Sequence, residues 1–595
     1  MTQRQRPYVI GIVLLALALR LPCLLSAQVV LTEGTTYTTI ARSLAAGRGY
    51  VGILGVVDFF VPPLYPLLMA GLARLGLDAV WAGRLLSLIL GTLLPLPVYW
   101  LTKNLSGRRS AGLFSALLIA AHPLLVVYAS RVWSETTYSF LIWCGLCFAW
   151  ASLKRGKWIA AGAAGLCFGA AYLTRHEGAI YQVVFLVLLG VLWVWETWQS
   201  RGGRVSQDAG GDQKGSGRAK YRLTQAVASL VAFALLAVPY VIWLSGQGGR
   251  LMWETKSVPN FVTAQRMAVG LSYTEAAYGL TPSAEPAGPF LFRNELLRKP
   301  PATGDLALVD RVRTGLDGLQ AAVRLVLTEI SSPLATVLAL FGLLAGHWGS
   351  ERLRRGRGFA VLFAAALFFL LPGLTKPLAL LLLIPVCWRG WDRHSLASVG
   401  YPLVFLLPTV AVISLVPRVY TRYLTPLVGY VALWAGIGLA GTRRWAREEW
   451  ADRPRWAGSA ELLLSLFVVV VVVHSIQGGI LAFWPPLEAA DLDQRIAGEW
   501  LAAYDASSDK RIMSVHSQLP FYAGGVHAPL PYASPELVQR YAENQDVDYV
   551  VVSARKLRSR APLEVWTRGE GIPEAWQSIY EDRDADLTIY RRSWE

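Results

Sequence analysis

The sequence is poor in charged residues and in cysteine. Asp, Glu, Lys and Arg make up only 16% of its 595 residues, whereas 54% are hydrophobic and the mean hydropathy is +0.40. This is more apolar surface than one or two water-soluble cores can bury, which argues against a soluble globular protein. The five cysteines lie in or beside apolar runs, so they imply neither a disulfide framework nor a metal cluster; they are Cys23, Cys144, Cys147, Cys167 and Cys387.

Apolar runs suited to a lipid bilayer recur from Tyr8 to Trp484. A bilayer core about 30 Å thick needs about 20 apolar residues per helical crossing, so we expect an α-helical polytopic membrane protein with about 13 transmembrane helices. The expected spans are residues 8–27, 82–102, 111–128, 135–153, 158–174, 179–197, 223–244, 331–347, 359–372, 376–388, 397–416, 424–441 and 461–484.

The net charge of +16 is concentrated in short basic clusters between alternate apolar runs. Placing these clusters in the cytoplasm satisfies the positive-inside rule and puts the N-terminus inside and the C-terminus outside. Topology therefore accounts for the charge, and no nucleic-acid partner is expected. No Asn-x-Ser/Thr sequon lies in a predicted outer segment, which favours a plasma (inner) membrane.

We expect two domains. Residues 1–484 form the transmembrane domain, with outer loops at 28–80 and 245–332 and a polar cytoplasmic linker at 198–222. Residues 485–595 return to soluble patterning and predict a small extracytoplasmic α/β domain. In this tail the basic run Arg555–Arg560 is interpreted as a solvated face. The expected elements are helices at 35–46 and 62–77 in the first loop, and in the tail helices at 491–504 and 535–543 and strands at 511–515, 548–552 and 587–590.

Charged residues at the predicted outer ends of spans are the candidates for chemistry. Glu33 follows the first span closely, at the level where a lipid-linked substrate would present its headgroup. Glu135 opens the fourth span, where it is also a favourable first-turn residue for a helix capped by Ser134. Arg175 and Arg422 lie at other outer mouths, and guanidinium groups suit phosphate because they offer forked donors and a permanent charge.

Several stretches in this order resemble the GT-C glycosyltransferases, in particular the branch of protein O-mannosyltransferases and bacterial aminoarabinose transferases acting on lipid A. The resemblance covers about residues 8–484 and is carried by TEGTTYTTIARSLAAGRGY (32–50), PPLYPLLMAGLARLG (62–76), AGRLLSLILGTLLPLPVYWL (82–101), SRVWSETTYSFL (130–141), LTRHEG (173–178) and RVYTRYLTPL (418–427). It implies a hexosyl- or pentosyltransferase whose donor is a polyprenyl-phosphate sugar. The implied acceptor is a glycan, a lipid or a protein.

The resemblance also implies roles for individual residues. Glu33 matches the proposed catalytic base, although many relatives carry a second acidic residue where Gly34 stands, and Glu135 matches a second catalytic carboxylate. The residues implied to bind substrate or phosphate are Arg84, Arg175, His176, Arg418, Arg422 and Tyr423. For His176, where relatives commonly have proline, an incidental replacement and a substrate contact both stay open. The implied reaction is a single displacement with inversion at the anomeric carbon.

No cofactor is expected, because arginine can neutralise a monophosphate leaving group and the outer loops lack an acidic or histidine cluster with metal-ligand spacing. Two other functions remain possible. A transporter or flippase of lipid-linked or anionic solutes would also place charges at helix ends, but no internal repeat is apparent. A non-catalytic scaffold whose tail binds a partner is the other alternative.

Overall fold

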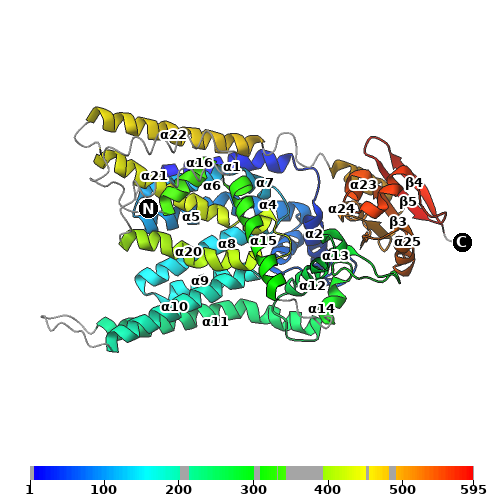
Figure 1. The fold of residues 1–595 in the computed structure, drawn as a ribbon, viewed down its shortest axis with the longest axis horizontal. Coiled ribbons are helices and arrows are strands. Elements are labelled where there is room, and N and C mark those ends of the chain that lie inside the picture. The colour runs from blue at the N-terminus through cyan, green and yellow to red at the C-terminus, as the bar shows by residue number, and fades with distance from the viewer. Residues whose placement is uncertain are drawn as a thin grey trace.

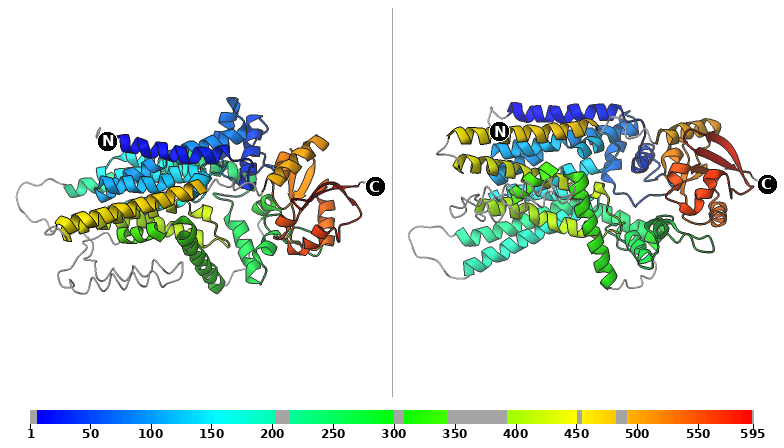
Figure 2. Two further views of the ribbon diagram at one scale, coloured as in Figure 1. Left: turned by 90° about the horizontal axis from the view of Figure 1, so that it is seen from above. Right: turned by 45° about the horizontal axis from the view of Figure 1, so that its top comes forward.

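The computed structural model describes residues 6–201, 214–299, 308–331, 333–343, 393–449, 454–481 and 491–593. Long helices run side by side along the molecule, and a small domain containing a β-sheet lies at one end (Figures 1 and 2). We call this end of the helical region the domain end. The expected spans at 359–372 and 376–388 lie outside the described residues.

The helical region follows the apolar runs of the sequence. Helix α8 illustrates the local reasons: Glu135 opens its first turn, Lys154 and Arg155 occupy its last turn, and Gly156 ends it in the left-handed conformation at φ 70°. The helices of this region are α1 (Arg6–Leu25), α4 (Ala79–Leu93), α5 (Pro95–Ser106), α6 (Arg109–Ala121), α7 (Pro123–Tyr128), α8 (Glu135–Arg155), α9 (Trp158–Tyr172), α10 (Gly178–Arg201), α11 (Lys214–Gly248), α15 (Leu308–Leu325), the π-helical turn η2 (Val326–Ile330), α16 (Pro333–Leu343), α20 (Arg393–Ser414), α21 (Leu427–Glu449) and α22 (Pro454–Leu481).

The expected count of about 13 spans is not confirmed. Within the described residues, six helices are long and apolar enough to cross a membrane: Arg6–Leu25, Ala79–Ser106, Glu135–Arg155, Gly178–Gln199, Tyr221–Gly248 and Ala397–Ser414. Some of the other expected spans are shorter or interrupted. The run at 111–128, for example, is divided into α6 and α7 at Pro123, which begins the second of these helices.

The residues expected in the cytoplasmic linker 198–222 are partly helical. Helix α10 continues to Arg201 and α11 begins at Lys214, so helical structure enters the predicted linker from both sides. The Gly- and Ser-containing composition did not indicate this, because it carries no apolar periodicity of its own.

Small residues allow close packing of the helices. Gly145 of α8 faces the ring of Phe168, and Gly429 of α21 faces Trp143; an added Cβ at either glycine would overlap the neighbouring ring. Trp143, Phe168 and Tyr430 are buried in the same apolar core. Small residues at helix contacts are the usual way in which membrane helices gain van der Waals contact, so this core fixes how α8, α9 and α21 meet.

Short helices cover the domain end. In the first long loop α2 (Thr32–Ala45) and α3 (Leu64–Arg74) agree with the expected helices at 35–46 and 62–77. The second long loop contains α12 (Ser257–Ala268), α13 (Tyr273–Tyr278) and α14 (Arg293–Arg298), and the 3₁₀ turn η5 (Thr421–Leu424) precedes α21. Of these elements, α2, α12, α13 and α14 lie between the long helices and the C-terminal domain in Figure 1.

The C-terminal domain is a five-stranded mixed sheet with helices packed on it. The strand order is β2-β1-β3-β5-β4, in which β1 pairs in parallel with β2 and β3, and β5 pairs antiparallel with β3 and β4. Its elements are α23 (Leu492–Tyr504), β1 (Arg511–Ser514), α24 (Gln518–Tyr522), β2 (Val526–Pro529), α25 (Pro535–Asn544), β3 (Tyr549–Ser553), α26 (Ala554–Leu557), η7 (Ala561–Arg568), β4 (Trp576–Asp582) and β5 (Leu587–Arg592). The five elements expected in the tail are present, whereas β2 and β4 were not predicted.

The interpretation of Arg555–Arg560 as a solvated face is wrong in part. Arg560 is buried and its guanidinium carbon lies 4.3 Å from the ring centre of Tyr278 in α13. Lys556 donates to Asp491 at 2.5 Å, and both side chains are mostly buried. The basic run therefore serves contacts within the domain and with the second loop.

Candidate active site

An ion pair joins Glu33 to Arg422 at the domain end of the helices. Glu33 stands in the first turn of α2, where the helix dipole favours a carboxylate, and Arg422 belongs to η5. Arg422 donates through Nη1 to Glu33 Oε1 although 389 positions separate the two residues. The side chains are 40% and 24% exposed, respectively, so this pair is accessible to a ligand.

A second, buried ion pair lies beside the first. Arg175, between α9 and α10, donates through Nη1 to Glu135 Oε1 at 2.6 Å, and the two side chains are only 7% and 5% exposed. Arg175 Nη2 also lies 3.6 Å from Glu177 Oε1. Lys256, just before α12, donates to the same Glu177 oxygen at 3.3 Å. This pairing compensates for the large cost of desolvating the buried charges.

The charges of this second group are stabilised by one another. Burial alone would lower the pKa of Arg175, but Glu177 and Glu135 outweigh it and hold the pKa above its usual value. Burial would likewise raise the pKa of Glu177, but Lys256 and Arg175 hold that pKa well below its usual range. Arg175 and Glu177 therefore stay ionised throughout the physiological pH range.

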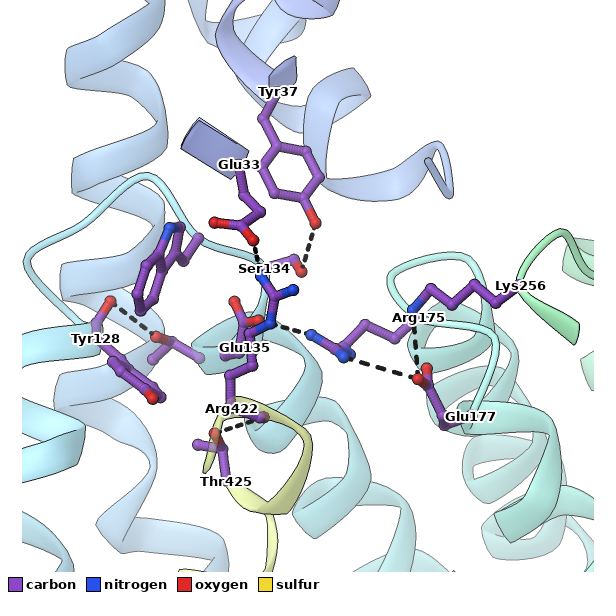
Figure 3. Close-up of polar contacts among 12 residues, drawn as sticks. Glu33, Tyr37, Tyr128, Ser134, Glu135, Arg175, Glu177, Lys256, Arg422 and Thr425 are labelled. Atoms are coloured by element: carbon purple, nitrogen blue, oxygen red, sulfur yellow. Dashed lines mark hydrogen bonds and ion pairs between the residues drawn. The ribbon is translucent and has the colours of Figure 1, made fainter. Parts of the chain in front are cut away.

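Aromatic side chains connect the two ion pairs. The ring of Tyr423 lies 5.3 Å from the guanidinium carbon of Arg175 and 5.3 Å from that of Arg422, which are cation–π distances. Tyr37 of α2 exchanges a 2.9 Å hydrogen bond with Ser134, next to Glu135. Figure 3 shows Glu33 and Arg422, Tyr37 and Ser134, and Arg175 and Glu135 pointing toward one another. We call Glu33, Glu135, Arg175, Glu177 and Arg422 the carboxylate–arginine cluster.

Opposite charges are balanced in this cluster. With Lys256 included, its carboxylates are matched by an equal number of cations. Among the described residues, two buried polar atoms of the cluster, Arg422 Nε and Glu177 Oε2, have no hydrogen-bond partner. Arg422 thus keeps a donor for a further group. Within the residues that the structure describes, no group of three or more His, Cys, Asp and Glu side chains is placed to hold a metal ion.

The structure brings together five of the eight residues predicted for the site, namely Glu33, Glu135, Arg175, Arg422 and Tyr423. His176 is adjacent to them but turns to a different neighbour: its Nε2 lies 3.0 Å from the Tyr240 hydroxyl, and the two rings stack with centres 6.0 Å apart. Burial and the nearby Lys256 lower the pKa of His176 to about 3, so its imidazole is neutral.

Arg84 and Arg418 are held by other groups. Arg84 is buried in α4, with its guanidinium carbon 5.6 Å from the ring centre of Trp81 on the same helix. The guanidinium of Arg418 lies between two aromatic rings, 5.3 Å from Tyr273 of α13 and 5.2 Å from Tyr420. Arg418 therefore contacts the second loop through Tyr273.

Four residues of the site were not predicted: Tyr37, Tyr138, Glu177 and Lys256. Glu177 follows Arg175 by two positions, and that spacing is the one signal that could have identified it. Tyr138, whose ring centre lies 5.9 Å from the Arg175 guanidinium carbon, is one turn from Glu135 on α8. Lys256 reaches the cluster only through the course of the second loop, which no local pattern encodes.

The chain is similar to several known proteins. A family model described as Dolichyl-phosphate-mannose-protein mannosyltransferase matches residues 61–203. The ArnT structure from Cupriavidus metallidurans in the apo state has a TM-score of 0.50 at 15% identity and covers 99% of this chain and 98% of that chain. The apo oligosaccharyltransferase of Archaeoglobus fulgidus has a TM-score of 0.51 at 13% identity, over 100% of this chain and 75% of that chain. None of the curated proteins matches the chain.

At these identities the structural likeness shows the fold alone, which the chain shares with ArnT and with the archaeal oligosaccharyltransferase. The family-model match and the two structures together confirm the resemblance that the sequence motifs indicated.

Proposed function

We propose that this protein transfers a glycosyl group from a polyprenyl-phosphate sugar to an acceptor on the outer side of the membrane. The observation that carries the proposal is the meeting of Glu33 and Arg422, beside the buried pair of Glu135 and Arg175, at one end of the helices. These residues come from distant segments of the chain, so local folding does not explain why their charges meet, whereas a shared binding site does. The description of the matching family model, which names a lipid-phosphate sugar donor, supports the donor class.

The proposed step is a single displacement with inversion. The acceptor hydroxyl oxygen attacks the anomeric carbon as the bond from that carbon to the phosphate oxygen breaks, and the bonding electron pair leaves with the polyprenyl phosphate. Glu33 takes the proton of the acceptor hydroxyl as general base. Arg422 stabilises the charge that develops on the departing phosphate, and a preorganised donor of this kind contributes about 3–4 kcal/mol in a dry site.

The two ion pairs suit different tasks in this mechanism. The exposed pair can open: when the donor phosphate binds to Arg422, Glu33 loses its partner and becomes free to accept a proton, and Arg422 Nε offers a further donor. The buried pair is held by Glu177 and Lys256 as well. We therefore assign Arg175 mainly to the electrostatic field of the site, with Glu135 orienting it.

The membrane orientation belongs to the same proposal. The basic clusters place the N-terminus in the cytoplasm, so the domain end and its carboxylate–arginine cluster would face the outer side of the plasma (inner) membrane. Glycan, lipid and protein acceptors are all compatible with a hydroxyl nucleophile at that position.

The test is transfer of label in membrane vesicles that contain the protein and the native acceptor pool. A panel of polyprenyl-phosphate hexoses and pentoses, each labelled in the sugar, is supplied without nucleotide sugar. We expect label to enter the acceptor fraction, to require Glu33 and to release polyprenyl phosphate in equal amount. Movement of intact labelled carrier across the bilayer, without cleavage of the sugar–phosphate bond, would instead identify a flippase and overturn the proposal.

A further inference from the structure

The first turn of α2, which carries Glu33, is not held by a cap of its own. Its N-cap residue is Leu31, which provides no side-chain hydrogen bond to the free amides of that turn. An uncapped helix end frays readily, yet a general base must be held in a precise direction. The groups that fix this turn must therefore come from elsewhere in the chain.

The C-terminal domain supplies such groups on both sides of Glu33. Before it, Val30 N donates to the Tyr522 hydroxyl at 2.8 Å, and the Thr32 hydroxyl donates to Gln518 Oε1 at 3.2 Å. After it, the hydroxyls of Thr35 and Ser517 lie 2.7 Å apart. These hydrogen bonds join α24 and the residue before it to a helix more than 480 positions earlier in the sequence.

Gln518 has both ends of its amide engaged. Oε1 accepts from Thr32, while Nε2 donates to Asp491 Oδ2 at 3.1 Å. Asp491 in turn accepts from Lys556 at 2.5 Å and from Arg555 at 3.2 Å. The Gln518 side chain is buried, so exchanging these partners for water is costly. The amide therefore has one orientation, and through it the C-terminal domain fixes the position of Thr32.

The opposite side of the same turn is also closed. A Cβ on Gly34 would lie 3.1 Å from the Val132 carbonyl oxygen and 2.9 Å from Val30 Cγ1, so the helix packs tightly against the segment before α8. The first turn of α2 is thus held between the segment before α8 and the C-terminal domain. Without the contact to the domain, only one side of this turn would be fixed.

We propose that Gln518 is a positioning residue for Glu33, through which the C-terminal domain sets the direction of the catalytic carboxylate. This inference rests on the proposed function, because it takes Glu33 to be the base. It gives the tail a role in the reaction without any contact between the tail and the substrate.

The central experiment is a double-mutant cycle on the transfer rate in the vesicle assay. Gln518→Met keeps the length of the side chain but removes both hydrogen bonds, and Thr32→Val removes the same contact from the α2 side. We expect each to lower the rate at saturating donor by about 10- to 100-fold, with the half-saturating donor concentration changed less than about 2-fold. In a Glu33→Gln background, Gln518→Met should lower the rate no further, because its effect passes through Glu33.

The matched control is Gln539→Met on α25, which removes a 3.2 Å hydrogen bond to Glu543 within the same domain. It should keep the wild-type rate. The swap Gln518→Glu with Asp491→Asn exchanges amide and carboxylate, so the pair can bond again and the rate should recover relative to Gln518→Glu alone. Recovery of this kind would not follow from a general loss of folding.

Hydrogen exchange supplies a readout that does not depend on activity. Peptides covering residues 28–37 should exchange faster in Gln518→Met than in Gln539→Met. Unchanged exchange, or a rate loss that adds fully to that of Glu33→Gln, would overturn the positioning role. If no label enters the acceptor fraction with the wild-type protein, the proposed function has failed. If transfer occurs but Glu33→Gln keeps the wild-type rate, Glu33 is not the base and Gln518 has no base to position. Normal turnover in Gln518→Met, together with an inactive Glu33→Gln, refutes the positioning role alone.

Discussion

Replacing Glu33 by glutamine should separate catalysis from stability. The amide keeps the shape of the side chain and can still accept a hydrogen bond from Arg422, but it cannot take a proton. The pair is partly exposed, at 40% for Glu33 and 24% for Arg422. Exposed ion pairs contribute about 0.2–1 kcal/mol, so the free energy of unfolding should fall by no more than about 1 kcal/mol. Turnover should fall by about 10²- to 10⁴-fold, the usual contribution of a general base, which corresponds to about 3–5 kcal/mol of activation free energy.

Glu135→Gln should give the opposite pattern if Glu135 mainly orients Arg175. The Glu135 side chain is 5% exposed and Arg175 7%, and breaking a buried pair costs about 3–5 kcal/mol because the remaining charge is left uncompensated. Glu177 still contacts Arg175, and the amide still accepts a hydrogen bond, so we expect the lower end of that range, about 3 kcal/mol. Stability should therefore fall more than it does in Glu33→Gln.

The assay pairs transfer rates in vesicles with chemical denaturation of the purified protein, and binding of the unlabelled carrier phosphate serves as the control for an intact site. Glu33→Gln should keep carrier binding. Near-normal turnover in Glu33→Gln, together with abolished turnover and unchanged stability in Glu135→Gln, would refute the reasoning and move the base to Glu135.

Three other predictions follow from the site and the topology. Arg422→Ala should weaken carrier binding and turnover with little loss of stability, whereas Arg175→Ala should also destabilise the protein because it leaves buried Glu135 unpaired. Measurements of carrier binding and of denaturation distinguish the two variants. Equal stability of the two variants would contradict the division of roles. A cysteine replacing the exposed Ser508 should react with an impermeant thiol reagent only from the outer side, and labelling from the cytoplasm would reverse the topology. The pKa of His176 falls from 6.5 in the unfolded chain to about 3 in the fold, so its contribution to stability is present above pH 6.5 and is lost as the pH falls toward 3. Denaturation curves of His176→Phe should therefore show a smaller loss of stability on acidification than those of the wild type. An unchanged loss of stability would contradict a buried neutral imidazole.

The sequence by itself determined the class of the protein. The apolar runs, the scarcity of charge and the basic clusters indicated a polytopic helical membrane protein, because a helix satisfies its own backbone groups within lipid and about 20 apolar residues suffice for one helical crossing. Local patterns also located α2, α3 and five of the ten elements of the tail. The helix count was harder to predict: hydropathy does not reveal where Pro123 divides a run.

The candidate site was predictable where a charged residue stands at a helix end. Glu33, Glu135, Arg175 and Arg422 were all identified in this way, since charge at a membrane boundary needs a partner or a task. Their pairing was not predictable. No local pattern indicates that Arg422 pairs with Glu33 and Arg175 with Glu135, rather than the reverse.

Only the tertiary structure decided which pair is buried and which is accessible, and this difference is why we propose Glu33 and not Glu135 as the base. It also decided the role of the tail. The residues of Arg555–Arg560 look like a solvated basic run in the sequence, yet Lys556 and Arg560 are mostly buried in contacts that fix the domain. Gln518 carries no sequence signal at all, because its importance comes from Thr32, a residue 486 positions away that only folding brings within hydrogen-bond distance.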